Sequence, residues 1–258
     1  MFDPKEDFNA KDAKDTQRAR WQIGVGGDCF VAPLRRKRGL RLSGCNRRRR
    51  LREVRVKAVR ISGTEHYAEE APDLLKRYES ISFADTHRSV MHLIPNNPCD
   101  VLDIGSGTGR DAAGFAALGH RVVAAEPTEE LRCGAMALHP SPLIEWLDDS
   151  LPDLAILLAR GERFDVVMLT AVWMHLDEQQ RRRAIPHVAA LVRSGGVMIM
   201  TLRHGPVPPG RRMFEVSAEE TISLAQPMGF CCVVHRPAKL SLRQPGVTWT
   251  RLAFRKSL

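Results

Sequence analysis

Seven residues near the middle of the chain form a loop suited to close contact between backbone and ligand. Residues 103–109 read Asp-Ile-Gly-Ser-Gly-Thr-Gly, after a short apolar stretch and before a helical pattern. Glycine allows the backbone to turn tightly and to approach a ligand without a clash at Cβ. The free N–H groups at the start of the following helix suit a carboxylate or a phosphate. We therefore expect a ligand-binding site at this loop.

The spacing of the glycines excludes two common nucleotide sites. A dinucleotide-binding fingerprint requires Gly-x-Gly-x-x-Gly, but the sixth position counted from Gly105 is Arg110. The Gly-Lys-Ser/Thr of a P-loop is absent as well. The loop therefore indicates another class of ligand site at the carboxyl end of a strand.

Strand and helix patterns alternate from residue 61 onward and place the loop in a fold. Apolar residues at helical spacing predict two helices before the loop, over 66–78 and 84–93, and Pro95 and Pro98 end the second. Strands are expected at 100–104, 121–126, 143–147, 164–170, 197–202, 231–235 and 247–254. Helices are expected between them at 110–118, 129–138, 153–159, 177–192 and 217–228, the fourth ending at the Ser-Gly-Gly of 194–196.

This alternation predicts an α/β fold, a doubly wound Rossmann-like sheet of seven strands with helices on both faces. Crossover helices make most of the strands parallel, with right-handed connections. The last two strands have no helix between them, so we expect an antiparallel C-terminal pair at one sheet edge. The loop at 103–109 then follows the first strand, where sheets of this kind bind ligands.

Residues 101–109, Val-Leu-Asp-Ile-Gly-Ser-Gly-Thr-Gly, resemble motif I of the class I S-adenosylmethionine-dependent methyltransferases, in the broad small-molecule group described as methyltransferase type 11/12/25. The resemblance extends over residues 61–258. It implies S-adenosyl-L-methionine (SAM) as the cofactor and methyl transfer (EC 2.1.1.-) by in-line displacement. Motif I is specific for the superfamily and carries almost no information about the acceptor.

The resemblance also implies which residues hold the cofactor. Glu126, which ends the second strand, corresponds to the family's contact with both ribose hydroxyls, a role that suits a carboxylate. Asp103 corresponds to the acid that orients the methionine end, and either Asp148 or Asp149 to the contact with the adenine amino group. The expected set is Asp103, Gly105, Ser106, Gly107, Thr108, Gly109, Glu126, Pro127, Asp148, Asp149, Thr170, Ala171 and Tyr67.

The acceptor is expected to lie among residues after the fourth and fifth strands and in the first helices. His175 is a candidate general base, since its ordinary pKa near 6.5 suits that role; a structural hydrogen bond is the alternative. Arg203, Arg211 or Arg212 would bind an acidic acceptor or remain a solvated loop charge. An aromatic face near a sulfonium is attractive, which favours Tyr67 and Tyr78. The expected acceptor contacts are Tyr78, Trp173, His175, Arg203 and His204.

Two diagnostic motifs of macromolecular methyltransferases are missing. The chain has no Asn/Asp-Pro-Pro-Tyr, which enzymes that methylate nucleic-acid amino groups use to stack a flipped base, and no paired-glutamate loop of the protein arginine enzymes. A small-molecule acceptor is therefore expected. Two alternatives stay open: an RNA- or protein-directed methyltransferase recruited by a basic N-terminal arm, and a non-catalytic scaffold that binds the cofactor.

Residues 1–60 differ from the rest of the chain in charge. Thirteen Lys and Arg residues lie between 35 and 60 against one acid, Glu53, whereas residues 61–258 carry 21 bases and 23 acids. Three interpretations stay open: a disordered tail, an upstream extension from a start codon set too early, or an arm that binds nucleic acid or a membrane. We expect a domain boundary at 60/61, residues 61–95 as a helical cap over the active site, and nucleic acid as a partner only through 35–60.

The composition of the chain indicates the cellular compartment and the kinds of partner to expect. No apolar stretch approaches the roughly 20 residues of a membrane span, and the first thirty residues lack the apolar region of a secretory signal. The six cysteines form no CxxC pair, which favours free thiols in the cytoplasm. The nine histidines are scattered, so we predict no metal site. The expectation is a cytoplasmic enzyme with a small-molecule acceptor and no membrane partner, and with its oligomeric state open.

Overall fold

A seven-stranded sheet organises residues 61–238 and 245–258, the part of the chain that this computed structural model describes. The basic segment 35–60 lies outside the described residues, so the interpretations of the N-terminal arm stay predictions. The strands are β1 (Asp100–Ile104), β2 (Arg121–Ala125), β3 (Ile144–Leu147), β4 (Phe164–Leu169), β5 (Val192–His204), β6 (Phe230–Pro237) and β7 (Thr248–Lys256).

The strand order is β3-β2-β1-β4-β5-β7-β6. The first five strands pair in parallel, while β7 inserts antiparallel between β5 and β6. The predicted Rossmann-like sheet with an antiparallel C-terminal pair is therefore confirmed. The order reverses at β1, and both neighbours of β1 run parallel to it. The ends of β1, β2 and β4 therefore meet at the point where such sheets bind ligands.

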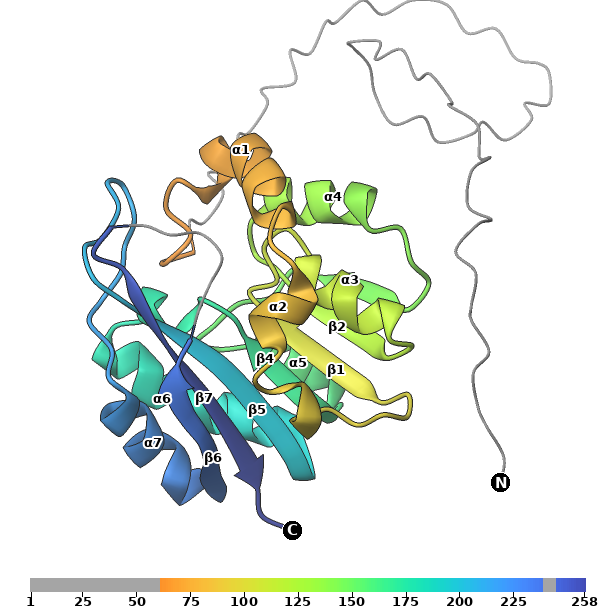
Figure 1. The fold of residues 1–258 in the computed structure, drawn as a ribbon, viewed down its shortest axis with the longest axis vertical. Helices are drawn as coiled ribbons and strands as arrows, with labels where there is room; N and C mark the ends of the chain where they lie inside the picture. The colour runs from red at the N-terminus through yellow and green to blue at the C-terminus, as the bar shows by residue number, and fades with distance from the viewer. Residues whose placement is uncertain (1–60, 239–244) are drawn as a thin grey trace, which may run out of the picture. The chain divides into compact units, whose positions relative to one another are not determined.

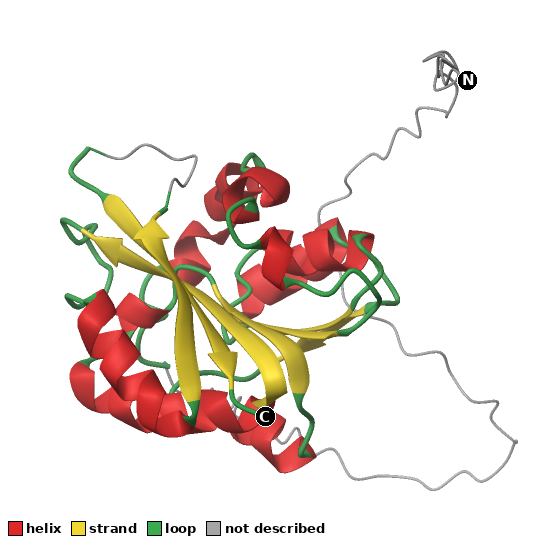
Figure 2. Ribbon diagram, turned by 60° about the horizontal axis from the view of Figure 1, so that its bottom comes forward, coloured by secondary structure: helices red, strands yellow, loops and turns green. Residues whose placement is uncertain are grey.

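Helices cover both faces of the sheet (Figures 1 and 2). One buried cluster joins the sheet to α5, α6 and α7, and a second joins it to α3 and the segment around Val90 and Ile94. A third, smaller cluster packs Leu74 of α1 against Leu131 of α4. The α-helices are α1 (Tyr67–Glu79), α2 (Phe83–His87), α3 (Arg110–Ala117), α4 (Glu129–Leu138), α5 (Ala155–Arg160), α6 (Glu178–Leu191) and α7 (Ala218–Ala225).

The main departures from the predicted elements are a helix that is interrupted and a strand that begins earlier than expected. The helix expected over 84–93 is interrupted: α2 ends at His87, and a 3-10 turn, Met91–Leu93, follows Val90, which has left the helical conformation and is fully buried. The helix expected over 177–192 ends at Leu191, and β5 begins at once. Gly195 and Gly196 therefore lie inside the strand. A Cβ at Gly196 would approach two carbonyl oxygens to 3.0 Å or less, so this irregular stretch requires glycine.

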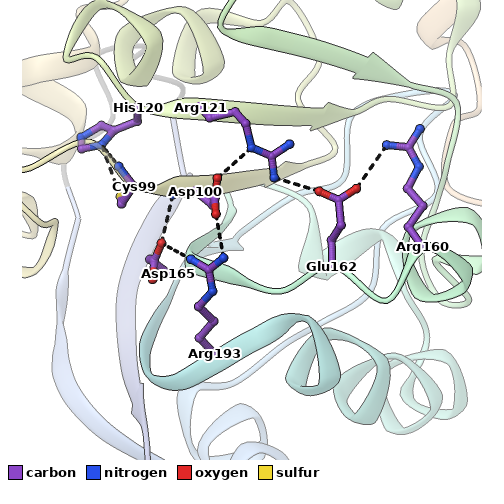
Figure 3. A network of polar contacts seen from close by, with 8 residues as sticks. All are labelled: Cys99, Asp100, His120, Arg121, Arg160, Glu162, Asp165 and Arg193. Atoms are coloured by element: carbon purple, nitrogen blue, oxygen red, sulfur yellow. Dashed lines mark hydrogen bonds and ion pairs between the residues drawn. The ribbon is translucent and has the colours of Figure 1, made fainter.

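The amino ends of four parallel strands are joined by one ionic network (Figure 3). Asp100 at the start of β1 accepts hydrogen bonds of 2.7 Å from both Arg121 and Arg193. Arg193 also pairs with Asp165 of β4, and Arg121 donates to Glu162 at 2.8 Å. These side chains are partly exposed, so each pair contributes at most about 1 kcal/mol. The network leaves the opposite, carboxyl ends of the strands to other residues.

Cys99, directly before β1, approaches a histidine without becoming a nucleophile. Its Sγ lies 3.3 Å from Nδ1 of His120 (Figure 3). Burial raises the pKa of the Cys99 thiol to about 11 and lowers the pKa of His120. Both groups are therefore neutral at pH 7. A reactive cysteine requires a thiolate, so this pair is a packing contact.

The described residues can also be compared with the requirements for a membrane span, a metal site and a disulfide. Residues 61–238 and 245–258 contain no helix with the length and apolarity needed to cross a bilayer, and no cluster of three or more possible metal ligands. The cysteines in these ranges, Cys99, Cys133, Cys231 and Cys232, are free thiols.

A buried chain of hydrogen bonds connects β7 to α2 and α3. Arg251, 1% exposed, donates to Nδ1 of His87 at 3.0 Å and to the carbonyl of Thr86 at 2.8 Å. Nε2 of His87 then donates to Asp111 at 2.9 Å. Burial by itself would raise the pKa of Asp111, but His87 and Arg110 outweigh it and hold this pKa well below its ordinary value. The chain thus fixes the start of α3, directly after the glycine loop.

We predict that Arg251→Leu lowers the free energy of unfolding by about 3 to 5 kcal/mol, because it breaks a buried charged network. Arg88→Leu is the matched control, since Arg88 forms an exposed pair with Asp85, and its loss should cost less than about 1 kcal/mol. Urea denaturation at pH 7 measures both. Equal, small losses for the two variants would contradict the role assigned to the buried chain.

Candidate active site

A cavity of about 330 Å³ lies at the carboxyl ends of β1, β2 and β4. Its lining comes from the segment 61–81 that includes α1, the glycine loop, the residues after β2, β3 and β4, the loop after β5, and Trp249 of β7. This size is within the usual range for small-molecule sites. The structure thus brings together segments that lie more than 140 residues apart in the sequence.

The glycine loop turns sharply at the end of β1. Gly105, Gly107 and Gly109 have φ values of +68°, +58° and +81°, which L side chains rarely adopt. The N–H groups of Gly105 and Ser106 both donate to the carbonyl of Ala125 at the end of β2. A Cβ at Gly105 would lie 2.6 Å from Val172, whereas a Cβ at Gly107 would meet nothing within 4 Å. Gly107 therefore faces open space on the cavity.

Two buried acids flank this loop. Glu126 is 5% exposed, and its two oxygens accept hydrogen bonds of 2.8 Å from the N–H groups of Gly107 and Thr128. Burial nevertheless raises the pKa of Glu126. Asp103 is 2% exposed, and burial followed by the nearby Asp111 raises its pKa well above the ordinary value. Each carboxylate oxygen has lone pairs left to accept further hydrogen bonds from a ligand.

Three buried polar atoms on the cavity have no hydrogen-bond partner within the described residues. They are Oδ2 of Asp103, Oγ of Ser106 and Oγ of Thr170. Buried polar groups in proteins are nearly always paired, so a polar ligand fits here. SAM, implied by the resemblance, carries an ammonium group, a carboxylate and ribose hydroxyls. The acids and hydroxyls at this end of the cavity suit such a ligand.

Of the seven other residues predicted to hold the cofactor, five line the cavity and two do not. Pro127, Asp149 and Ala171 line the cavity, as do Thr108 and Tyr67.

Ala171 has a φ of +60°, a strained conformation that is common at functional sites. Asp148 and Gly109 do not line the cavity. The Asp148 side chain is exposed and pairs with Arg132, and Gly109 packs against Trp146, where a Cβ would lie 2.4 Å from the indole. Of the two aspartates, Asp149 is therefore the one beside the cavity, although its oxygens already accept from the N–H groups of Ser150 and Leu157.

His175 forms a pair with Tyr67 across the cavity wall. Nδ1 of His175 lies 2.9 Å from the carbonyl oxygen of Arg212, which can only accept, so Nδ1 carries the hydrogen. Nε2 is then the acceptor for the hydroxyl of Tyr67 at 3.1 Å. Burial lowers the pKa of His175 and raises that of Tyr67. Both side chains are therefore neutral at pH 7, with the Tyr67 oxygen still able to accept one more hydrogen bond.

The segment 61–79 is fastened over the cavity by the loop after β5. Arg211 of that loop donates to the carbonyl of Glu65 and to the carboxylate of Glu70, both at 2.7 Å. Its guanidinium lies 3.8 Å from the centre of the Tyr67 ring, a cation–π contact. A Cβ at Gly210 would approach the His66 ring to 2.8 Å, so the two segments are in close contact.

The structure places two of the predicted acceptor contacts outside the cavity. Trp173 is fully buried in the core beside the sheet and does not reach the cavity. His204 hydrogen-bonds Thr250 of β7 at 2.9 Å and also lies outside this cavity. The physical reasons differ. Trp173 begins the 3-10 turn Trp173–His175 and packs into the core, whereas His204 is the last residue of β5, where successive side chains such as those of Arg203 and His204 point to opposite faces of the sheet. Tyr78 and Arg203, in contrast, line the cavity.

Sequence patterns did not single out three other lining residues, Val172, Met213 and Trp249. Trp249 is near the end of the chain, and it lies opposite Arg203 only because β7 pairs with β5. No local signal indicates such a long-range pairing. Val172 follows the strained Ala171 and packs over Gly105, which no spacing rule predicts. We call Tyr67, Tyr78, His175, Arg203 and Trp249 the aromatic–arginine end of the cavity.

Comparison with known proteins agrees with this geometry. Residues 101–196 match the family model described as a methyltransferase domain. Among curated proteins, no sequence matches the chain.

Among solved structures, a 1,6-didemethyltoxoflavin-N1-methyltransferase from Burkholderia thailandensis is 21% identical, with a TM-score of 0.59 over 74% of this chain and 86% of that one. A TehB-like SAM-dependent methyltransferase from Corynebacterium glutamicum is 18% identical, with a TM-score of 0.58 over 73% and 99% of the two chains. The cyclase SpnF is 14% identical, with a TM-score of 0.54 over 70% and 80%.

At these identities the solved structures establish the fold, and the family match covers the glycine loop, Glu126 and the residues around His175. The match to the family model, the order of the strands and the glycine loop with its two buried acids all agree. The chain therefore carries a class I S-adenosylmethionine-dependent methyltransferase domain.

Proposed function

We propose that this methyltransferase acts on a small molecule held at the aromatic–arginine end of the cavity. The observation that carries the proposal is the cover over part of the cavity, formed where Arg211 ties the loop after β5 to Glu65 and Glu70. An acceptor that reacts beneath this cover has to fit between it and the sheet. A nucleic acid or a folded protein would need an open groove along the surface.

The neighbours support this choice of acceptor. The Burkholderia enzyme was crystallised with 1,6-didemethyltoxoflavin, a small molecule, together with S-adenosylhomocysteine (SAH). Another neighbour is a magnesium protoporphyrin IX methyltransferase with bound SAM. Since a cyclase shares the fold, the fold by itself does not define the reaction. The choice of a small acceptor therefore depends on the covered part of the cavity in this chain.

In the proposed complex, the acids and the glycine loop hold the cofactor. Glu126 would accept from the ribose hydroxyls and Asp103 would orient the methionine end, while Asp149 would lie beside the adenine. The residues assigned to cofactor binding are Asp103, Gly105, Ser106, Gly107, Thr108, Glu126, Pro127, Asp149, Thr170, Ala171 and Tyr67. When bound, SAM supplies an activated methyl group on a sulfonium. Alignment of the acceptor behind that group can contribute on the order of 7 to 11 kcal/mol.

The Tyr67–His175 pair would assist an acceptor that loses a proton. Because Tyr67 donates to Nε2 of His175, its oxygen can accept a hydrogen from the acceptor while its own proton moves to His175. His175 would thus act as the base through Tyr67. General-base assistance typically adds roughly 10²–10⁴-fold to a rate, so we assign the larger part of catalysis to alignment.

We predict that Gly107→Arg abolishes SAM and SAH binding, because the new side chain fills the space that faces the cavity. Gly161→Arg is the matched control. Gly161 also has a positive φ, +68°, with nothing within 4 Å of a Cβ, but it ends α5 outside the cavity. Both substitutions therefore carry similar backbone strain. Titration calorimetry measures the affinities, and full SAM affinity in Gly107→Arg would overturn the assignment of the loop.

We predict that His175 titrates below its ordinary pKa of 6.5 and carries its hydrogen on Nδ1. A lowered pKa keeps the neutral form down to lower pH, so a rate that requires neutral His175 falls only below pH 6.5. The histidine His87 is the internal control, since Arg251 donates to its Nδ1 and its hydrogen must lie on Nε2. Nitrogen-15 NMR distinguishes the two tautomers. A hydrogen on Nε2 of His175 would exclude the route through Tyr67.

We propose that residues 61–258 form the catalytic domain and that residues 1–60 are dispensable for cofactor binding. A chain that begins at Ile61 should then bind SAH with unchanged affinity in calorimetry. If the shortened chain folds but loses affinity, the boundary is wrong. Affinity for RNA that falls steeply with salt and disappears in the shortened chain would instead favour the alternative of an RNA-directed enzyme.

A further inference from the structure

We infer that Arg203 binds an anionic group of the acceptor, and that the acceptor is a small planar molecule carrying a carboxylate. This inference rests on the proposed function and names the substrate class for the same cavity. It starts from a buried arginine that no acid neutralises.

Arg203 ends up buried because β5 continues to the edge of the cavity. The residue is 7% exposed. Its Nη2 donates to the carbonyl of Pro206 at 2.8 Å and its Nη1 more weakly to that of Gly205 at 3.4 Å. Both partners are neutral. No carboxylate of the described residues lies within ion-pair distance of Arg203.

The other buried arginines of the described residues reach a carboxylate, either directly or through one histidine. Arg181 forms two hydrogen bonds of 2.9 Å with Glu220. Arg251 donates to His87, which in turn donates to Asp111. Buried charges are usually paired in this way, because an isolated one costs several kcal/mol. Arg203 lacks such a partner, and a bound carboxylate would supply it.

The surroundings of Arg203 are cationic or aromatic. Burial lowers the pKa of His175, and the nearby Arg211 and Arg203 lower it further. Tyr67 and Tyr78 line the same cavity as Arg203. Trp249 stands opposite Arg203 on the neighbouring strand. Burial is the main factor, and it lowers the pKa of Arg203. A planar ring can pack among these aromatic side chains while its carboxylate meets the guanidinium.

The opposite end of the cavity has the opposite charge. Asp103, Glu126 and Asp149 lie near the glycine loop, where a sulfonium and an ammonium group suit them. The carboxylate of SAM is the one competing anion for Arg203. An experiment can distinguish a carboxylate on the acceptor from the carboxylate of SAM, because only the second would link Arg203 to the affinity for the cofactor.

The test uses two probes that have the same shape but different charge, benzoate and benzamide, on the full chain saturated with SAH. We expect benzoate to bind about tenfold to a hundredfold tighter than benzamide, as for a hydrogen bond to a charged group. Arg203→Gln should remove this preference and leave SAH affinity within about twofold. Arg182→Gln is the control with the same loss of charge, since Arg182 lies exposed on α6 and pairs with Glu178.

Three results would overturn the inference: equal binding of the two probes by the unaltered protein, a preference for benzoate that survives in Arg203→Gln, or a large loss of SAH affinity in that variant. The last would assign Arg203 to the carboxylate of the cofactor. If Arg203→Gln does not fold, Arg203→Lys decides, because it keeps the charge but loses the planar fork: benzoate should then bind several-fold more weakly than in the unaltered protein while benzamide binds as before. Unchanged benzoate affinity in Arg203→Lys would contradict the inference.

Failure of the proposed function gives a different result. In that case the unaltered protein does not bind SAH at all. The comparison of benzoate with benzamide is then made on the protein alone, and the same variants still show whether Arg203 selects an anion.

Discussion

The tight turn after β1 is the constraint on which the cavity depends. Two successive N–H groups, those of Gly105 and Ser106, donate to one carbonyl at the end of β2, so the loop cannot move independently of the sheet. Val172 lies against Gly105 from the other side, where a Cβ would clash. Only glycine satisfies both contacts at a positive φ. The start of α3 and the N–H that holds Glu126 take their positions from this turn.

The cavity holds charges that the protein itself does not fully neutralise. Asp103 and Glu126 are buried near the loop with raised pKa values, and Arg203 is buried at the other end with only carbonyl partners. Each costs stability in the empty protein and favours a ligand of opposite charge or one that donates hydrogen bonds. The acids therefore mark the part of the cavity proposed for the cofactor, and Arg203 marks the part proposed for the acceptor.

Two polar networks away from the acceptor end of the cavity stabilise the fold. The ionic network at the amino ends of the strands and the buried chain from Arg251 to Asp111 hold the sheet and α3 in place. The loops at the carboxyl ends can then vary in sequence without loss of the sheet. This explains how a toxoflavin methyltransferase and a cyclase share the fold at low identity, since a fold of this type supports many reactions through its loops.

Local sequence determined the sheet, the glycine loop and the acids beside it. Apolar runs of five to seven residues, separated by helical patterns, predict β1 to β5, and glycines at 105, 107 and 109 predict the turn, because both signals arise within a few residues. Because these signals reach only a few residues, they do not predict features that depend on distant contacts. The break after His87 and the bulge at Gly195 result from packing against other elements.

The tertiary structure decided which residues face the cavity. Trp173 and His175 are two residues apart, yet one is in the core and the other pairs with Tyr67. Trp249 meets Arg203 only because β7 inserts beside β5. Burial and partners over such distances depend on how the elements pack. The sequence by itself therefore determined the fold and the cofactor, and only the packed structure determined the contacts at the acceptor end.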